Sequence, residues 1–318
     1  MTRRVVVTDH AFGGVAQEEA VARRFDAEFG AFQCRSEAET AEAVAGAQVA
    51  FVNFAPITEK VLAAMAPGAA VIRYGIGYDN VDVDAALRVG VSVANVPDYG
   101  TETVADHAVA CLLALLRRLP AYDRAIRTDG WVTPTGLGSL PGLASTTVGL
   151  VGIGSIGLAV ERRLRPFGIT VVASDPNADR DELAARGVHL VDLPDLLASS
   201  HAVSLHAPLV PATHHLIDAA ALGRMRRGAV LVNTSRGGLV DHDALADALA
   251  SGHLAAAALD VFEPEPLPPD ARLREFPQVL LTPHAAFFSD DSVAALQRLA
   301  AEEAARALAG DPLRCRVA

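Results

Sequence analysis

The sequence predicts an α/β protein built from two doubly wound parallel-sheet domains separated by a cleft. Short β-branched runs alternate with helical segments along the chain, which is typical of parallel strands joined by crossover helices. The length of 318 residues exceeds what one ordinary hydrophobic core supports, so two compact domains are expected. We place the first domain at residues 1–97 plus 286–318 and the second at residues 98–285.

The first domain begins with four short apolar runs that are predicted to be strands. They are VVVT at 5–8, VAFV at 49–52, VIRY at 71–74 and VSVANV at 91–96. After Pro97 comes TETVADHAVACLLALLRRL, whose apolar residues recur at helical spacing. This segment is predicted to be a buried connecting helix. Its apolar face carries Val104, Ala108, Cys111, Leu112 and Leu115.

A second series of predicted strands begins at TTVGLVGIG. It continues through ITVVASD, HAVSLHAP, GAVLVNTS, AAALD and QVLLTPH. Each run ends in polar or small residues, and the carboxyl ends of parallel strands face the ligand crevice of an open sheet. Functional residues are therefore expected directly after these strands. The last segment, SVAALQRLAAEEAARALAG at 292–310, is predicted to be an amphipathic helix that packs on the first domain.

Composition excludes several classes of function. The net charge of −11 argues against nucleic acids and anionic membranes as partners, because both favour a concentrated positive surface. Lys60 is the only lysine, and its context ITEKVL fits neither a Schiff-base lysine nor a GxxxxGK phosphate loop. The three cysteines, Cys34, Cys111 and Cys315, form no CxxC pair, which fits a reducing compartment.

We expect a cytoplasmic protein without a targeting or membrane-spanning segment. The start, MTRRVVVTDH, has an apolar run of only three residues, which is too short for a signal-peptide core. Even CLLALL ends at Arg117 and Arg118, far short of the roughly 20 apolar residues that span a membrane.

A dinucleotide-binding fingerprint lies in VGLVGIGSIGLAVERRL. Gly152, Gly154 and Gly157 give GxGxxG directly after an apolar strand and directly before a helix. In this context the first glycine allows a tight turn, the second lets the backbone approach a pyrophosphate and the third permits close helix-to-strand packing. Amides near Ser155 and Ile156, at the helix N-terminus, are expected to bind phosphate oxygens.

The next strand favours NAD as the cofactor. VVASDPN places Asp175 at its end, 18 residues beyond Gly157, where a carboxylate accepts hydrogen bonds from the ribose hydroxyls. The same charge would repel the 2′-phosphate of NADP, although Arg180 lies nearby. Because about 145 residues precede the fingerprint, we expect a Rossmann-like NAD-binding domain inserted into a Rossmann-like or flavodoxin-like first domain.

Three further segments follow late strands of the NAD-binding half: NTSRGGLVD around Arg236, LDVFEPEP around Glu265 and TPHAAFF around His284. With GIGSIG and with RYGIGYDNVDVDAA at 73–86, they resemble the D-2-hydroxyacid dehydrogenases over nearly the whole chain. The resemblance implies an NAD-dependent reductase of 2-keto acids. It implies that Arg236 binds the carboxylate and carbonyl of the substrate and that His284 is the acid/base, paired to Glu265. Glu263 is an alternative partner for His284. In the family pattern, however, the paired glutamate stands before the second proline of this loop, which favours Glu265.

Apart from the resemblance, the chemistry of hydride transfer itself requires an acid/base, a carboxylate beside it and a fixed cation. Reduction of a 2-keto acid leaves negative charge on the carbonyl oxygen, so a proton must arrive and a fixed cation should stabilise the charge. An imidazole, with an unperturbed pKa of ~6.5, is protonated too little near neutrality unless a carboxylate lies beside it. Glu265 is the expected carboxylate.

The resemblance extends to further residues around the expected substrate and cofactor. Gly75, Ile76 and Gly77 form a turn after the strand VIRY, and in the family the amides of this turn bind the substrate carboxylate. A purely structural turn is compatible with the same sequence. Arg73 is the obvious cation near this turn for a phosphate-bearing substrate. The other expected contacts are Thr103, His206 and Asp260 to the cofactor, the last at the nicotinamide carboxamide, and Phe287 to the substrate.

His206, His214 and His215 raise the question of a metal site. Adjacent histidines in a loop are expected to point in different directions, and no acidic or cysteine residue stands at ligand spacing. We therefore expect no metal.

The residues after His284 favour one branch of the family. Many members have TPHIGG, whereas this chain has TPHAAFFSDDS. With IRYGIGYDN, HHLID and PLRCRVA, this segment resembles the C-terminal-binding proteins, NAD-binding transcriptional corepressors of animals, which carry tryptophan at the position of Phe287. Two hypotheses follow: an NAD-dependent reductase of small 2-keto acids, and an NAD(H)-sensing scaffold whose turnover is incidental. The lack of low-complexity interaction segments favours the enzyme.

The substrate and the assembly are only partly predicted. Glyoxylate, hydroxypyruvate, pyruvate-like and bulkier apolar keto acids all stay open, while formate oxidation is disfavoured because its enzymes carry glutamine where Glu265 stands. A homodimer is expected from the resemblance, with the helix after Pro97 and the segment GWVTPTGLG as candidate contacts. An apolar side-chain pocket is indicated by Phe54, Tyr78, Tyr99 and Phe287.

Overall fold

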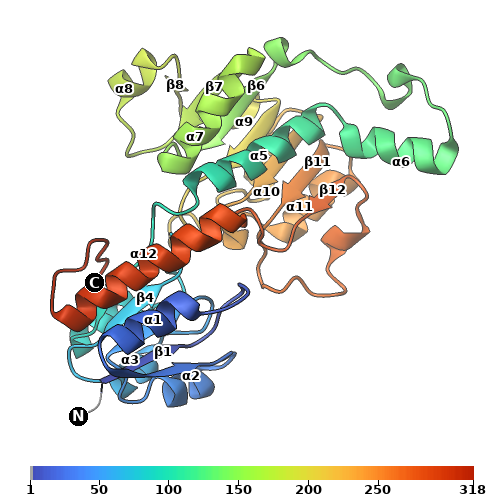
Figure 1. Cartoon of the computed structure of the whole chain (residues 1–318). Helices are drawn as coiled ribbons and strands as arrows, with labels where there is room; N and C mark the ends of the chain where they lie inside the picture. Colours follow the sequence, from blue (N-terminus) through green and yellow to red (C-terminus); the bar gives the residue numbers. More distant parts are fainter. Residues whose placement is uncertain (1–2) are drawn as a thin grey trace. The chain divides into compact units, whose positions relative to one another are not determined.

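The computed structural model of the protein describes residues 3–318, which form two compact units. One unit runs up to Gly100 and includes Phe288–Ala318, and the other is Thr101–Phe287. Each unit has its own parallel sheet with helices on both faces (Figure 1). The predicted α/β class with two doubly wound sheets is confirmed.

The first unit contains a five-stranded sheet in the order β2-β1-β3-β4-β5, and each pair of neighbouring strands is parallel. This is the flavodoxin-like strand order. Both central strands, β3 and β4, are buried along their whole length, as expected for parallel strands covered on two faces. The strands are β1 Arg3–Val7, β2 Ala27–Ala31, β3 Val49–Val52, β4 Ala70–Arg73 and β5 Ser92–Ala94.

Helices cover both faces of this sheet. One face packs on α1 (Ala16–Arg24) and α12 (Asp290–Ala309), so the carboxyl-terminal helix lies in the same unit as the first strands. The other face packs on α2 (Glu37–Ala43), α3 (Glu59–Ala64) and α4 (Val83–Val89). Alternate residues of each strand therefore enter two separate apolar layers.

The second unit contains a seven-stranded sheet in the order β12-β11-β10-β9-β6-β7-β8. All neighbouring strands are parallel. The strand order reverses between β6 and β9, which is the topological switch point of a Rossmann sheet and places a ligand crevice outside the carboxyl ends of the strands. The strands are β6 Thr147–Val151, β7 Thr170–Ser174, β8 His189–Leu190, β9 Ala202–Leu205, β10 Ala229–Asn233, β11 Leu254–Leu259 and β12 Val279–Leu281.

Two groups of helices sandwich this second sheet (Figure 1). On one face lie α5 (Thr101–Leu116), α7 (Ser155–Leu164) and α8 (Arg180–Ala185). On the other lie α9 (Leu193–Ser199), α10 (Ala219–Arg224) and α11 (His242–Ala250). Short 3-10 turns are η1 Pro134–Leu137, η2 Leu143–Ser145, η3 Arg165–Phe167, η4 Gly237–Leu239 and η5 Arg272–Glu275.

Helix α6 (Leu119–Asp129) follows α5 and extends away from the sheet of its unit (Figure 1). Only Ala125 of this helix is buried. Large apolar side chains stay exposed here, with Leu119 at 58%, Ile126 at 43% and Trp131 at 90%. Within residues 3–318, none of the helices is both long enough and apolar enough to cross a membrane.

Candidate active site

The glycine turn after β6 has the geometry that the fingerprint predicts. Gly152 adopts a φ of +88°, and a Cβ atom there would come within 2.7 Å of the backbone of His206 and Ala207. A Cβ atom on Gly157 would come within 2.6 Å of the Gly152 carbonyl oxygen. By contrast, a Cβ atom on Gly154 would meet no atom of the described residues within 4 Å. Two of the glycines are thus required by packing, while Gly154 faces open space where a ligand can approach.

Helix α7 begins directly at this turn. Ser155 and Ile156 occupy its first positions after the N-cap residue Gly154, so their amides lie among the helix N-terminal donors that have no intrahelical acceptor. Such donors and the positive end of the helix dipole favour a phosphate group.

Asp175 lies beside the same turn, one residue after β7. Its Oδ2 atom accepts a hydrogen bond from the Ile153 amide at 3.0 Å, and its Oδ1 atom accepts one from the Asn177 amide at 2.9 Å. A carboxylate offers about four acceptor sites, so these two bonds orient the group and leave acceptor capacity for ribose hydroxyls. The open glycine, the helix terminus and the oriented carboxylate together fit a dinucleotide.

His284 follows β12 in a turn that Asp260 organises. The Asp260 side chain is 1% exposed, and its Oδ1 and Oδ2 atoms accept hydrogen bonds from the Ala285 and Ala286 amides at 2.8 and 2.9 Å. The Asp260 carbonyl oxygen accepts from the His284 amide at 2.7 Å. The Thr282 hydroxyl donates to the same carboxylate at 2.5 Å. Asp260 therefore fixes the backbone that presents His284, a contribution that sequence reasoning missed.

The side chains of His284 and Glu265 are in direct contact. The His284 Nδ1 atom lies 2.8 Å from the Glu265 Oε2 atom, and the side chains are 24% and 30% exposed. Glu265 Oε1 accepts a hydrogen bond from the Phe262 amide at 2.9 Å. Burial alone would raise the pKa of Glu265, but the hydrogen bond and charge of His284, the Phe262 amide and the charge of Arg236 together lower it. The carboxylate is thus ionised at neutral pH.

Arg236 lies in the turn after β10, half-buried. The Asn233 side chain donates to the Arg236 carbonyl oxygen at 2.8 Å, and the Arg236 guanidinium donates to the Ser235 carbonyl oxygen at 2.8 Å. The next residue, Gly237, touches the backbone of Phe262 and Glu263 so closely that a Cβ atom would overlap it. This contact holds the Arg236 turn against the loop that carries Glu265.

His206, Thr103 and Phe287 also lie in the second unit. His206 follows β9, and its Nε2 atom lies 3.0 Å from the Ser204 hydroxyl oxygen. Although the residue as a whole is only half-buried, burial by the surrounding protein lowers the pKa of His206 to about 4, so the ring is neutral at neutral pH. Thr103 is in the first turn of α5. The rings of Phe287 and His284 meet edge to face, with centroids 6.3 Å apart.

The expected substrate residues of the first unit lie at the end of β4 and in the turn after it. Gly75 has a φ of +118°, and the Arg73 guanidinium lies against it. The Ile76 carbonyl oxygen accepts a hydrogen bond from the Asn95 side chain at 2.7 Å. Gly77 is half-buried, whereas the Arg73 side chain is buried.

Sequence reasoning also overlooked Asp9, which follows β1 in the first unit. Its carboxylate accepts hydrogen bonds from the Asn53 and Phe54 amides at 3.0 and 2.6 Å, so it orders the chain at the carboxyl end of β3. The signal in the sequence was an acidic residue directly after the predicted strand VVVT.

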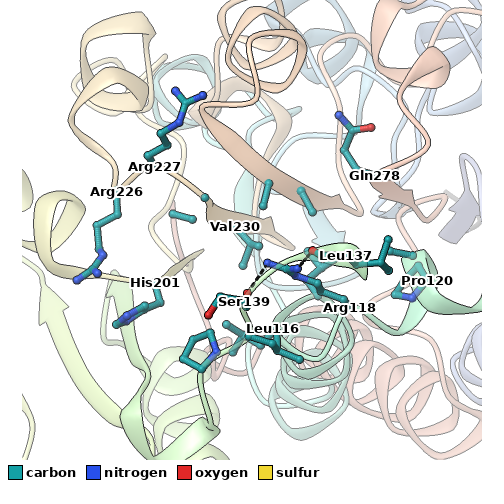
Figure 2. Close-up of a pocket in the computed structure, with 18 of the residues that line it drawn as sticks. Leu116, Arg118, Pro120, Leu137, Ser139, His201, Arg226, Arg227, Val230 and Gln278 are labelled. Carbon is teal, nitrogen blue, oxygen red and sulfur yellow. Dashed lines mark hydrogen bonds between the residues drawn. The ribbon is translucent and has the colours of Figure 1, made fainter. Parts of the chain in front are cut away.

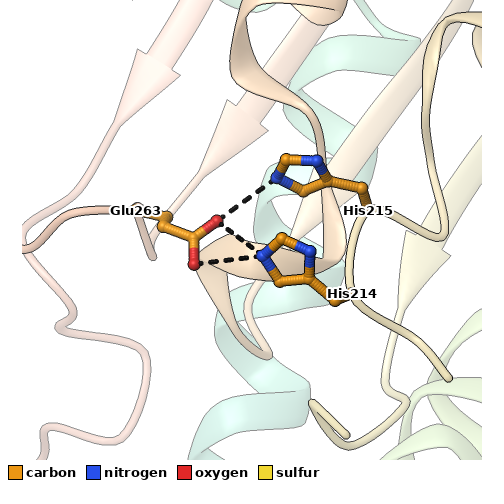
Figure 3. Close-up of side chains that lie close together, drawn as sticks. All are labelled: His214, His215 and Glu263. Atoms are coloured by element: carbon orange, nitrogen blue, oxygen red, sulfur yellow. Dashed lines mark hydrogen bonds and ion pairs between the residues drawn. The ribbon is translucent and has the colours of Figure 1, made fainter. Parts of the chain in front are cut away.

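One expectation about side-chain direction is wrong. The rings of His214 and His215 do not diverge but stack, with centroids 4.0 Å apart, and both Nε2 atoms face the Glu263 carboxylate (Figure 3). His215 adopts a φ of +50°, which turns its side chain to the same side as that of its neighbour. An acidic partner therefore exists in space, although it is 48 residues away in sequence.

A pocket of about 630 Å³ opens in the second unit, away from these residues (Figure 2). It lies at the amino ends of β9 to β12, where His201, Ala229 and Gln278 line it. The Arg118 guanidinium crosses it to the carbonyl oxygens of Leu137 and Ser139 (Figure 2). Because Glu265 and His284 follow the carboxyl ends of strands, this pocket is separate from the candidate active site.

Comparisons with known proteins agree with this geometry. Residues 109–286 match the sequence profile of the D-isomer specific 2-hydroxyacid dehydrogenase, NAD binding domain. A glyoxylate reductase of Korarchaeum cryptofilum is 42% identical over 249 residues, which cover 78% of this chain and 75% of that enzyme. A D-3-phosphoglycerate dehydrogenase of Mycobacterium bovis is 45% identical over 228 residues, which cover 72% of this chain but only 43% of that enzyme. The chain thus spans less than half the length of the mycobacterial relative.

Solved structures extend the similarity to the whole chain. The crystal structure of D-lactate dehydrogenase from Aquifex aeolicus, complexed with NAD and lactic acid, superposes with a TM-score of 0.87 at 26% identity. The superposition covers 97% of this chain and 96% of that one. The strand orders, the glycine turn and these matches converge on one assignment: the chain belongs to the D-isomer specific 2-hydroxyacid dehydrogenase family, and residues 109–286 match its NAD-binding domain.

Proposed function

We propose that the protein is an NAD-dependent oxidoreductase that reduces a small 2-keto acid to the D-2-hydroxy acid, and catalyses the reverse reaction, with His284 as acid/base. The observation that carries the proposal is the 2.8 Å contact between His284 Nδ1 and Glu265 Oε2 in the unit that holds the dinucleotide turn. The relatives named above are enzymes that act on such acids, which supports the same chemistry here.

In this proposal His284 supplies the proton and Arg236 supplies the fixed positive charge. The bound nicotinamide cofactor supplies the hydride. As the hydride arrives, charge develops on the substrate carbonyl oxygen, and a guanidinium beside it stabilises that charge. With Nδ1 hydrogen bonded to Glu265, the imidazole exchanges the substrate proton through Nε2. Because Glu265 is ionised, its negative charge stabilises the positive charge that the ring carries before it gives up the proton.

The proposed cofactor contacts and substrate contacts come from different segments of the chain. The cofactor is held by the glycine turn, the start of α7, Asp175 and three flanking residues, and the substrate by the turn after β4 together with Phe287. We assign residues 98–285 to cofactor binding and residues 1–97 plus 286–318 to substrate binding. The proposed cofactor residues are Gly152, Gly154, Ser155, Ile156, Gly157, Asp175, Thr103, His206 and Asp260. The proposed substrate residues are Arg73, Gly75, Ile76, Gly77 and Phe287.

The direct test is a panel of 2-keto acids with NADH and purified protein. Loss of absorbance at the NADH band with glyoxylate, hydroxypyruvate, pyruvate or a bulkier apolar keto acid would identify the substrate. Oxidation of 3-phosphoglycerate with NAD⁺ tests the activity of the mycobacterial relative. Arg236→Lys should raise KM and lower kcat for the accepted acid, because an ammonium cannot reproduce the planar bidentate contact. Tight binding of NADH without turnover of any acid would reject the proposal.

A second candidate is an NAD(H)-sensing scaffold of the C-terminal-binding-protein-like branch. The observation that favours it is the segment Ala285–Phe288, which replaces the glycine pair of many family members and leaves Phe288 57% exposed. The phosphoglycerate dehydrogenase and glyoxylate reductase relatives favour the enzyme instead. The keto-acid panel separates the two, since a scaffold would bind NADH but show little turnover.

We also propose that the protein is a homodimer. The support is the exposed apolar surface of α6 and the segment after it, carried by Leu119, Ile126 and Trp131, since monomers rarely expose large apolar side chains together. Sedimentation equilibrium should give twice the chain mass, and Trp131→Glu should shift the protein towards monomer. A monomer in the wild type at working concentrations would exclude the dimer.

A further inference from the structure

Three side chains outside the proposed catalytic set converge on one point. His214 and His215 come from the loop between β9 and α10, and Glu263 comes from the loop after β11 (Figure 3). The His214 Nε2 atom lies 3.3 Å from Glu263 Oε1, and the His215 Nε2 atom lies 3.3 Å from Glu263 Oε2. One ligand atom from each residue lies within 4.8 Å of the other two.

The backbone is shaped to bring the two imidazoles together. His215 is one of four non-glycine residues with positive φ among the described residues, a conformation that costs energy and clusters at functional sites. Its amide donates to the Gly238 carbonyl oxygen at 2.7 Å, which anchors the turn. As a result the two rings stack at an interplanar angle of 21° and present the same nitrogen in the same direction.

The distances fit a shared cation better than a pair of ordinary ion-paired hydrogen bonds. Charge-assisted N–H···O bonds are roughly 2.7–2.9 Å long, shorter than the two contacts of 3.3 Å. Two ligands bound tetrahedrally at about 2.0–2.2 Å from zinc lie roughly 3.3–3.5 Å apart. The two histidine–carboxylate distances of 3.3 Å therefore match the spacing of two ligands on a tetrahedral ion.

The surroundings hold Glu263 in place and leave one side open. A Cβ atom on Gly238 would come within 3.1 Å of Glu263 Oε1, so the carboxylate packs on the turn after β10. The three side chains are 41–49% exposed, which leaves room for water in a fourth coordination position. At the start of α11, the buried Nε2 atom of His242 has no hydrogen-bond partner among residues 3–318.

We propose that His214, His215 and Glu263 bind a divalent transition-metal cation, zinc by preference, with solvent as the fourth ligand. Two imidazoles and one carboxylate are a borderline-soft set that suits zinc, nickel or copper and disfavours magnesium and calcium. The cation would join the loop after β9 to the loop that also carries Glu265. This site is independent of the proposed oxidoreductase function, because its binding can be measured without turnover.

The test is a calorimetric titration of tag-free, chelator-treated protein with zinc chloride at neutral pH. We expect one ion per chain, a higher melting temperature in zinc because the ion binds the folded state, and much weaker binding of magnesium. His214→Ala, His215→Ala and Glu263→Gln should each weaken zinc binding roughly tenfold or more, since each removes a ligand. Binding should also weaken on acidification, because a protonated imidazole has no lone pair to donate.

Two matched variants separate this site from other histidines. His189, exposed on β8, is a remote control, and His189→Ala should leave the zinc affinity unchanged. His284→Ala removes the other histidine–glutamate pair and should retain one zinc per chain. The proposal is overturned if the wild type binds no zinc, if the three ligand variants bind it as tightly as the wild type, or if His284→Ala abolishes binding.

Discussion

The Nδ1 atom of His284 lies 2.8 Å from the Oε2 atom of Glu265, although 19 residues separate them in sequence. His284 reaches this position with a φ of +53°, in a turn whose amides are hydrogen bonded to buried Asp260. The imidazole is thus held on one side by a charged partner and beneath by a fixed backbone.

Replacing His284 by asparagine should abolish most of the turnover while leaving the cofactor site intact. A lost acid/base typically lowers kcat by ~10² to 10⁴. The expected result is a fall in kcat of at least ~10² with an NADH dissociation constant within about twofold of the wild type. Near-normal turnover of His284→Asn would remove the assignment of this residue as acid/base.

Glu265→Gln tests the charge of the partner apart from its shape. The amide oxygen can still accept from the imidazole, but it carries no charge to stabilise a cationic ring, so kcat/KM for keto-acid reduction should fall. Since the pKa of Glu265 is lowered in the folded protein, its carboxylate stabilises the fold above the unfolded-state pKa. That stability is lost as the pH falls through the folded-state pKa.

The variant should therefore be less stable than the wild type at neutral pH, and the difference should shrink in acid. Thermal unfolding at several pH values measures this stability difference, and kcat/KM at neutral pH measures the loss of keto-acid reduction. An unchanged kcat/KM together with an unchanged stability difference across pH would contradict the charged pairing.

The glycine fingerprint and Asp175 were predictable because local sequence determines their geometry. A GxGxxG turn between an apolar strand and a helix leaves few conformations, and the carboxylate follows the next strand at a set distance. Gly152 and Gly157 accordingly sit where a Cβ atom would overlap backbone atoms. Arg236 and His284 were likewise predictable as site residues, because functional residues are expected directly after the carboxyl ends of parallel strands.

Other features depend on tertiary contacts and left no local pattern. Strand β2, AEFGA, has no β-branched residue and forms only because it pairs with β1, and β8 has only two residues. The resemblance predicted Asp260 as a cofactor contact. Its hydrogen bonds to the turn that carries His284 could not be predicted, because they form between segments that are distant in sequence. The convergence of His214 and His215 on Glu263 depends on the left-handed backbone of His215, and two adjacent histidines in a sequence do not predict that conformation.

Asp175→Asn should change the choice of cofactor. The side-chain oxygen that remains can still accept from a neighbouring amide, so the turn should persist, but the charge that repels a 2′-phosphate is gone. Because a hydrogen bond to a charged group contributes about 1.5–3 kcal/mol, NADH affinity should fall roughly tenfold or more relative to NADPH. Asp181→Asn, at an exposed position on α8, is the control, and equal cofactor ratios in the two variants would argue against the ribose contact.

Gly152→Ala and Gly154→Ala should separate folding from cofactor binding within one turn. At Gly152 a methyl group meets backbone atoms at 2.7 Å and the φ is +88°, so overpacking of about 1–3 kcal/mol and backbone strain should lower the melting temperature by several degrees. At Gly154 the φ is −68° and a methyl group meets no atom, so the melting temperature should barely change. If a pyrophosphate approaches there, the methyl group should weaken NADH binding roughly tenfold, the equivalent of about 1.4 kcal/mol. Thermal unfolding and NADH titration of both variants decide the matter, and a Gly154→Ala protein that binds NADH like the wild type would show that the dinucleotide does not approach this backbone.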